Sequence, residues 1–118
     1  MAKSLLIISR QSPWSGPAAR EALDIVLAGG AFDLPIGLLF LDDGVLQLSA
    51  GQNAKALQQK DLSANLQALP MFGVEELFYC TESASARGLG EFSLDEAAPL
   101  AAEQITALID RYDLVITL

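Results

Sequence analysis

Four short apolar segments, separated by stretches of helical periodicity, constrain the fold of this chain most strongly. They lie at residues 4–9, 34–41, 77–80 and 114–118, and each is bounded by polar or turn-forming residues. Nearly continuous apolar runs of this length are typical of strands buried on both faces of a sheet. Because such strands alternate here with helical stretches, the sequence predicts a three-layer α/β/α domain with a mostly parallel sheet of four to five strands.

The first predicted helix connects the first two strands. It begins at Pro17, where the missing N–H of proline is harmless, and we expect Gly29 and Gly30 to end it. Its apolar residues recur every three or four positions and form one stripe: Ala19, Ala22, Leu23, Val26 and Leu27.

The second half of the chain predicts three more helical segments. A broken helical region is expected over residues 53–69, with Pro70 ending it, and a short helix is expected over residues 83–87. A clear apolar stripe predicts a longer helix from Pro99 to Tyr112. Residues 92–94 are expected to form a very short fifth strand at an edge of the sheet.

The length and composition favour one domain that associates with other chains. A chain of 118 residues suits a single core over residues 1–118. Apolar residues make up 52% and charged residues 19%, against about 45–50% and about 25% in average globular proteins. This excess of apolar residues predicts that some apolar surface is buried against other subunits, and a well-packed monomer is the alternative.

The charge and the lone cysteine restrict the partners and the compartment. The net charge is −8, which argues against unaided binding to nucleic acid, because that affinity comes largely from Lys and Arg. One cysteine permits no internal disulfide and fits a reducing compartment. The apolar runs are too short for a signal peptide or a membrane span, so we expect a cytoplasmic protein.

Cys80 is the first candidate for a chemical role. It stands where the third predicted strand ends and the next helix begins, and sites in parallel α/β sheets collect at the carboxyl ends of strands. The chain has no histidine, so this thiol is the one soft nucleophile available for covalent chemistry. The alternative is a small core residue, because free cysteine is among the most buried residue types.

Two other segments offer weaker candidate sites. The loop from Gln11 to Gly16 precedes a helix and could hold an anion, but it has one glycine and neither a GxGxxG nor a Walker A motif. Asp42 and Asp43 could bind a metal or act as acid and base, whereas Asp43-Gly44 is also ordinary turn chemistry. We therefore expect no cofactor and no metal.

Several groups of residues, in one order along the chain, resemble the DsrE/DsrF-like sulfur-relay family, and within it the TusC (DsrF) branch. They are Gly16, Arg20-Glu21-Ala22-Leu23-Asp24, Asp43-Gly44-Val45, Gln47-Leu48, Gly51-Gln52, Cys80 with Arg87-Gly88-Leu89, and Tyr112-Asp113-Leu114-Val115-Ile116. Ala22 stands where many relatives carry glycine. The resemblance implies the DsrE-like, flavodoxin-like α/β/α fold.

The resemblance also implies a function and partners. TusC-like chains join TusB-like and TusD-like chains in a heterohexamer, a dimer of three-chain units. That complex passes persulfide sulfur to a TusE-like carrier for 2-thiolation of the wobble uridine in tRNA. The related DsrEFH complex serves sulfur oxidation, which is one alternative function, and a small flavodoxin-like protein that binds a phosphate ligand is another.

Within such a complex, Cys80 is a candidate persulfide acceptor. The family usually carries the essential sulfur on the TusD-like chain, at the strand-end position that Cys80 matches here. The dipole of the following helix favours the Cys80 thiolate, and Arg87 could help, whereas Glu82 and an apolar strand oppose it. We therefore favour an assisting or structural subunit with no turnover of its own.

Overall fold

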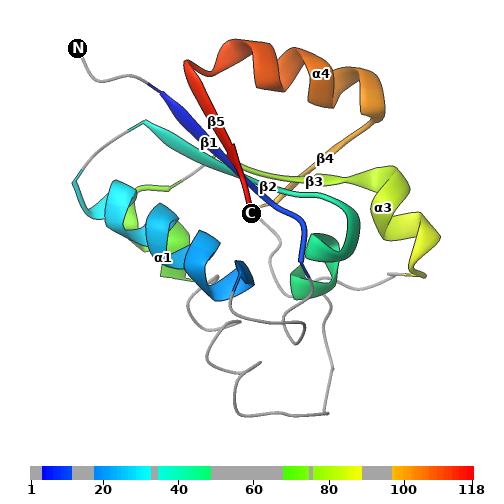
Figure 1. The fold of residues 1–118 in the computed structure, drawn as a ribbon, viewed down its shortest axis with the longest axis horizontal. Helices are drawn as coiled ribbons and strands as arrows, with labels where there is room; N and C mark the ends of the chain where they lie inside the picture. The colour runs from blue at the N-terminus through cyan, green and yellow to red at the C-terminus, as the bar shows by residue number, and fades with distance from the viewer. Residues whose placement is uncertain (1–3, 12–17, 33–34, 49–67, 75, 89–96) are drawn as a thin grey trace, which may run out of the picture.

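Five strands form one parallel sheet in the computed structural model, in the order β4-β3-β2-β1-β5 (Figure 1). The structure describes residues 4–11, 18–32, 35–48, 68–74, 76–88 and 97–118. The elements in chain order are β1 (Leu5–Ser9), α1 (Ala18–Ala31), β2 (Ile36–Phe40), the 3-10 helices η1 (Asp42–Leu48) and η2 (Leu69–Phe72), β3 (Glu76–Cys80), α3 (Thr81–Ala86), β4 (Ala98–Leu100), α4 (Ala102–Arg111) and β5 (Leu114–Thr117). The expected three-layer α/β/α fold is confirmed.

Two helices cover opposite faces of the sheet, and alternate strand residues point to each of them (Figure 1). α1 packs against one face, where its stripe of Ala22, Leu23 and Val26 meets the β1 residue Ile7. On the other face, α4 packs through Ile105 and Leu108. Both faces of the central strands are therefore buried, which explains why the sequences of these strands are nearly continuous apolar runs.

The strand order explains why the two helices take opposite faces. The chain moves from β1 through β2 and β3 to β4, and α4 then carries it back past β1 to β5. Crossovers between parallel strands are right-handed, so a reversal of direction puts the returning helix on the other face. The reversal also places the topological switch point between β1 and β5, at their carboxyl ends.

The end of α1 corrects one sequence prediction. Gly29 and Gly30 do not stop this helix, which continues to Ala31. Both glycines are buried, and a Cβ added at Gly29 would lie 2.8 Å from Cδ1 of Ile36. The first of these glycines therefore lets α1 approach β2 closely.

The region around Pro99 corrects a second prediction. Pro99 does not begin the last helix but lies in the edge strand β4, opposite Tyr79 of β3. Proline fits an edge strand because its missing N–H need not face a neighbouring strand. The helix itself begins later, at Ala102, and Gln104 Oε1 accepts a hydrogen bond from the N–H of Ala101 at 2.8 Å.

Other predictions differ in their limits or lie outside the described residues. Pro70 lies within η2, and the backbone changes direction instead at Gly73, whose φ is +85°. The short helix after β3 begins at Thr81, two residues earlier than predicted, and Gly88 follows it with φ +68°. The expected strand at 92–94 and residues 53–67 of the expected helical region lie outside the described residues. Among the described helices, none has the length and apolar character needed to cross a membrane.

Candidate functional site

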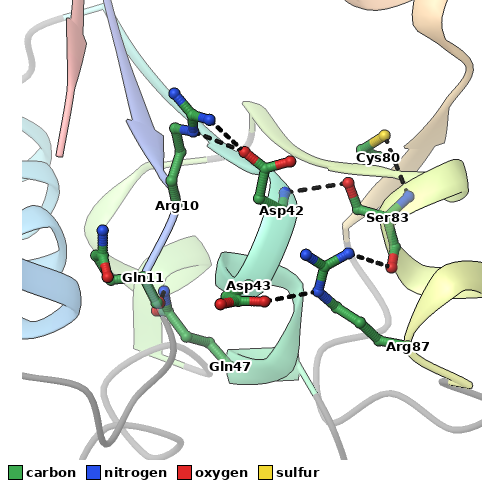
Figure 2. Close-up of polar contacts among 8 residues, drawn as sticks. All are labelled: Arg10, Gln11, Asp42, Asp43, Gln47, Cys80, Ser83 and Arg87. Atoms are coloured by element: carbon green, nitrogen blue, oxygen red, sulfur yellow. Dashed lines mark hydrogen bonds and ion pairs between the residues drawn. The ribbon is translucent and has the colours of Figure 1, made fainter.

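Polar residues gather at the carboxyl edge of the sheet, where β1, β2 and β3 end (Figure 2). Arg10 follows β1, Asp42 and Asp43 begin η1 after β2, and Cys80 is the last residue of β3. Ser83 and Arg87 come from α3 and its C-cap. Parallel strands end at the same edge, so residues up to 77 positions apart in sequence meet here.

Cys80 caps the N-terminus of α3. Its Sγ accepts a hydrogen bond from the backbone N–H of Ser83 at 3.4 Å, which makes Cys80 the N-cap of this helix. The side chain is 5% exposed and belongs to the apolar cluster under α4, beside Leu39 and Ile105. The thiol thus lies at the predicted strand end, in a buried position with one lone pair engaged.

The position of Cys80 in the sheet also matters. The strand order places β3 two strands away from β1, so Cys80 does not lie at the switch point between β1 and β5. Ligands of open parallel sheets bind preferentially at that point. The expectation that the strand end alone marks a site is therefore weaker here than the sequence suggested.

Ser83 connects α3 to η1. Its Oγ accepts a hydrogen bond from the N–H of Asp42 at 3.0 Å, and the side chain is buried. Asp42 has φ +53°, in the left-handed region that aspartate tolerates better than most residues. The Ser83 contact therefore secures the turn between β2 and η1 directly beside Cys80.

Each of the two aspartates pairs with an arginine. Arg10 Nη2 lies 2.6 Å from Asp42 Oδ2, and Arg87 Nε lies 2.8 Å from Asp43 Oδ1 (Figure 2). Arg87 also donates from Nη1 to the carbonyl oxygen of Ser83 at 3.1 Å, so it holds η1 against α3. The two carboxylates that the sequence suggested as metal ligands or acid–base groups are therefore both engaged in ion pairs.

Arg87, which the sequence suggested could favour the Cys80 thiolate, instead uses its guanidinium to bind Asp43 and the Ser83 carbonyl oxygen. Among the described residues, no group of three or more Cys, Asp or Glu side chains could hold a metal ion.

Gln47 is a buried residue of this edge whose contacts the sequence did not predict. Its Nε2 donates to Ser9 Oγ at 2.7 Å and to the Gln11 carbonyl oxygen at 3.1 Å. It thereby fixes the end of β1 against η1. A glutamine between the apolar residues Leu46 and Leu48 is the signal that could have indicated a buried amide. Residues 12–17 of the predicted anion-binding loop lie outside the described part of the chain.

Comparison with known proteins finds relatives of this chain, one of them over its full length. The chain is 64% identical over 119 residues to the protein TusC homolog of Pseudomonas aeruginosa, with both chains covered completely. It is 34% identical over 102 residues to the protein TusC homolog of Vibrio parahaemolyticus, which covers 86% of each chain. It is also 38% identical over 96 residues to the intracellular sulfur oxidation protein DsrF of Allochromatium vinosum, covering 81% of this chain and 71% of the relative.

A structural comparison and a family comparison agree with the relationship to these proteins. The crystal structure of the ychN protein from E. coli superposes with a TM-score of 0.74 over the whole of both chains, at 15% identity, and so supports the fold alone. The model of the DsrE/DsrF-like family matches residues 3–118. The chain belongs to the DsrE/DsrF-like family.

Proposed function

We propose that this chain is a TusC-like subunit of a sulfur-relay complex that passes persulfide sulfur for 2-thiolation of the wobble uridine in tRNA. The observation that carries this proposal is the 64% identity to a TusC homolog over the full length of both chains. The chain would act in the cytoplasm and have no turnover of its own.

The proposed partners are TusB-like and TusD-like chains in a heterohexamer, which is a dimer of three-chain units. A TusE-like carrier would receive sulfur from the assembled complex. The acidic net charge of −8 supports a role in which other chains contact the tRNA.

We assign Cys80 a structural role in this complex. Its Sγ caps α3, its side chain is 5% exposed, and its neighbours under α4 are apolar. A persulfide adds one more sulfur atom to the thiol and must reach an acceptor, and both requirements oppose such burial. Structural buried cysteines are generally inert for this reason.

Native mass spectrometry of the chain purified from its own cells tests the complex. The expected result is an assembly with two copies each of this chain and of two companion chains. A monomer with no companion chain would contradict the TusC-like assignment.

Replacement of Cys80 by serine tests its role within the complex. Serine can also cap a helix, so α3 should keep its start. The expected result is unchanged 2-thiouridine in tRNA, measured by mass spectrometry of nucleosides. Sulfur on Cys80 in intact-mass spectra, together with loss of 2-thiouridine in the variant, would instead make Cys80 a carrier.

Sulfur oxidation is the second candidate function. The 38% identity to the DsrF protein of Allochromatium vinosum favours it as an alternative. Deletion of the gene distinguishes the two functions, because loss of 2-thiouridine supports the tRNA pathway. Intact 2-thiouridine with impaired oxidation of stored sulfur would support the DsrF-like role.

A further inference from the structure

The helix α3 differs from the two longer helices in how it is attached to the sheet. Its six residues are two alanines, two serines, a threonine and a glutamate, and only Ser83 and Ala84 are buried. α4, by contrast, buries Ile105 and Leu108 against the sheet. Burial of large apolar side chains is the main source of stability in packing. α3 has no such side chain, so apolar packing holds it to the sheet only weakly.

Polar contacts attach α3 instead, and they reach two other segments of the chain. Thr81 Oγ1 donates to the carbonyl oxygen of Leu100, at the end of β4, at 3.2 Å. Ser83 and Arg87 bond the two residues that begin η1 (Figure 2). Contacts of this kind each contribute little net stability, because the same groups bond to water when they are free. α3 is therefore held in place by a small set of individually weak contacts.

The same helix covers the Cys80 thiol. α3 follows Cys80 without a linker, and the N–H of Ser83 donates to Sγ within the first turn (Figure 2). Other neighbours of Cys80, among them Leu39 and Ile105, belong to the sheet and to α4. Unwinding of α3 therefore breaks the bond to Sγ and uncovers the thiol toward the carboxyl edge, while the sheet and α4 keep their places.

The two ends of this segment differ in how firmly they are held. Cys80 is fixed in the sheet, where it pairs with Leu100 of β4. Gly88, which follows the helix, has φ +68°, and a Cβ added there would meet no atom of the described residues within 4 Å. The unit that can open therefore runs from Thr81 to Gly88.

We propose that α3 is a lid over Cys80, and that residues 81–88 open as a unit while the sheet stays folded. Proteins open locally in contiguous units at a smaller free-energy cost than global unfolding, and segments with few buried apolar contacts open most easily. In the closed state the thiol caps α3 and is inert, in agreement with its structural role. In the open state it is exposed to thiol-reactive molecules such as disulfides. The lid is a property of this chain and does not depend on the sulfur-relay function.

Because the chain has one cysteine, thiol labelling measures the opening directly. The probe is an aromatic disulfide: the Cys80 thiolate attacks one of its sulfurs, a mixed disulfide forms and one thionitrobenzoate leaves. When the lid closes faster than this reaction, the labelling rate is the open fraction multiplied by the rate for a free thiol. We expect the purified full-length chain to react in one phase, at least about tenfold more slowly than the urea-unfolded chain.

The dependence of this rate on urea distinguishes local opening from global unfolding. Opening of α3 exposes much less surface than unfolding of the whole chain. Below the unfolding transition, the labelling rate should therefore rise with urea with a slope clearly smaller than the m value of global unfolding.

Two variants should open the lid more often. Ser83→Ala removes the bond to the N–H of Asp42 but keeps the backbone N–H that bonds Cys80. Arg87→Gln removes the ion pair with Asp43. Each should raise the labelling rate about fivefold, the shift that loss of one such contact produces in an opening equilibrium.

Two controls leave the lid contacts intact. Val26→Ala makes a cavity between α1 and the sheet, so it lowers global stability without touching α3. Arg20→Gln is matched to Arg87→Gln, because it removes an ion pair with Asp24 that lies within α1. Both controls should label at the wild-type rate.

Hydrogen exchange of the unaltered chain tests the lid without any variant. The N–H groups of Ser83, Arg87 and Gly88 donate to Cys80 Sγ or to carbonyl oxygens of α3. They should exchange together, at least about tenfold faster than the N–H groups of β2. Mass spectrometry of peptides from the two segments measures both rates.

Three outcomes would overturn the proposal. One is a labelling rate that follows urea with the full m value and rises in Val26→Ala, because only global unfolding would then expose the thiol. Another is a wild-type rate equal to that of the unfolded chain, which would mean that α3 does not cover Cys80. The third is unchanged labelling in both Ser83→Ala and Arg87→Gln. None of these outcomes contradicts the sulfur-relay function, which the assembly and the 2-thiouridine content of tRNA test separately.

Discussion

At Gly44, the backbone of η1 approaches the end of β1 very closely, at the carboxyl edge of the sheet. A Cβ added there would overlap the carbonyl oxygen of Ser9, which belongs to the backbone and cannot easily move. That same oxygen accepts a hydrogen bond from the N–H of Leu41 at 3.1 Å. The glycine therefore permits η1 to pack against the end of β1.

Gly44→Ala should consequently destabilise the protein. We expect a loss of about 2–3 kcal/mol in the free energy of unfolding, the upper part of the usual range of about 1–3 kcal/mol for overpacking, measured by urea denaturation. Gly73→Ala is the control, because a Cβ there meets nothing within 4 Å and the cost is only the strain of φ +85°, about 1–2 kcal/mol. An equal or smaller loss for Gly44→Ala would show that Ser9 can move.

Tyr112 reaches across the sheet from the end of α4. Its hydroxyl donates a hydrogen bond to Glu76 Oε1 on β3, and Gly37 on β2 leaves the space that the phenol occupies. Partial burial, the hydrogen bond to Glu76 and the charge of that carboxylate all raise the pKa of Tyr112 above its usual range, because each disfavours the phenolate. Tyr112 therefore remains a neutral donor at physiological pH.

The raised pKa of Tyr112 predicts a pH dependence of stability. In the unfolded chain this tyrosine ionises near pH 10, so its contribution is complete below that pH and is lost progressively above it. Tyr112→Phe should cost about 1 kcal/mol at pH 7 and should flatten the fall in stability above pH 10. Urea titrations of both proteins at pH 8 and pH 10.5 measure this, and parallel pH profiles would contradict it.

At the scale of elements, α3 is too short to be stable alone, and its contacts determine its position. The helix has six residues, and Cys80, Ser83 and Arg87 connect it to β3 and η1. Isolated helices of this length are marginal in water, so these tertiary contacts supply its stability.

Arg87→Gln should therefore cost more stability than Arg10→Gln. The Arg87 side chain is 28% exposed and bonds both Asp43 and the Ser83 carbonyl, whereas the Arg10 side chain is 51% exposed and, among the described residues, pairs with Asp42. We expect a loss of about 1–2 kcal/mol for Arg87→Gln and less than about 1 kcal/mol for Arg10→Gln. Thermal unfolding at low and high salt measures both, and similar losses would contradict the assigned role of Arg87.

Sequence patterns placed the described elements well but set several of their limits wrongly. The apolar stripe identified α1, yet Gly29 lies inside this helix because close packing on Ile36 requires a small residue. Pro99 suggested a helix start, yet pairing with β3 makes it part of an edge strand. In both cases a contact that is distant in sequence outweighs the local preference of the residue.

At the scale of the whole molecule, the acidic charge predicts that the isolated chain does not bind tRNA. A net charge of −8 repels the phosphate backbone, and non-specific binders typically have Kd values of about 10⁻⁴–10⁻⁶ M. We expect no shift of tRNA in gels at micromolar chain concentration and physiological salt. The assembled complex serves as the comparison, and a salt-dependent shift by the chain alone would contradict the prediction.

The sequence by itself determined the class of fold and the position of Cys80 at the carboxyl end of a strand. Short apolar runs separated by helical stripes permit few arrangements other than a parallel sheet covered on both faces, because each apolar face must be buried. The end of β3 therefore had to fall at the carboxyl edge of the sheet.

Only the tertiary structure decided which residues meet at that edge. The pairs Arg10–Asp42, Arg87–Asp43 and Gln47–Ser9 join segments 32–44 residues apart, and their contacts depend on the strand order and on the close approach at Gly44. Strand order also left β5 as an unprotected edge, although its sequence resembles that of the buried strands. The reason is that a local pattern reports which side chains prefer burial, whereas the path of the whole chain determines what is available to bury them.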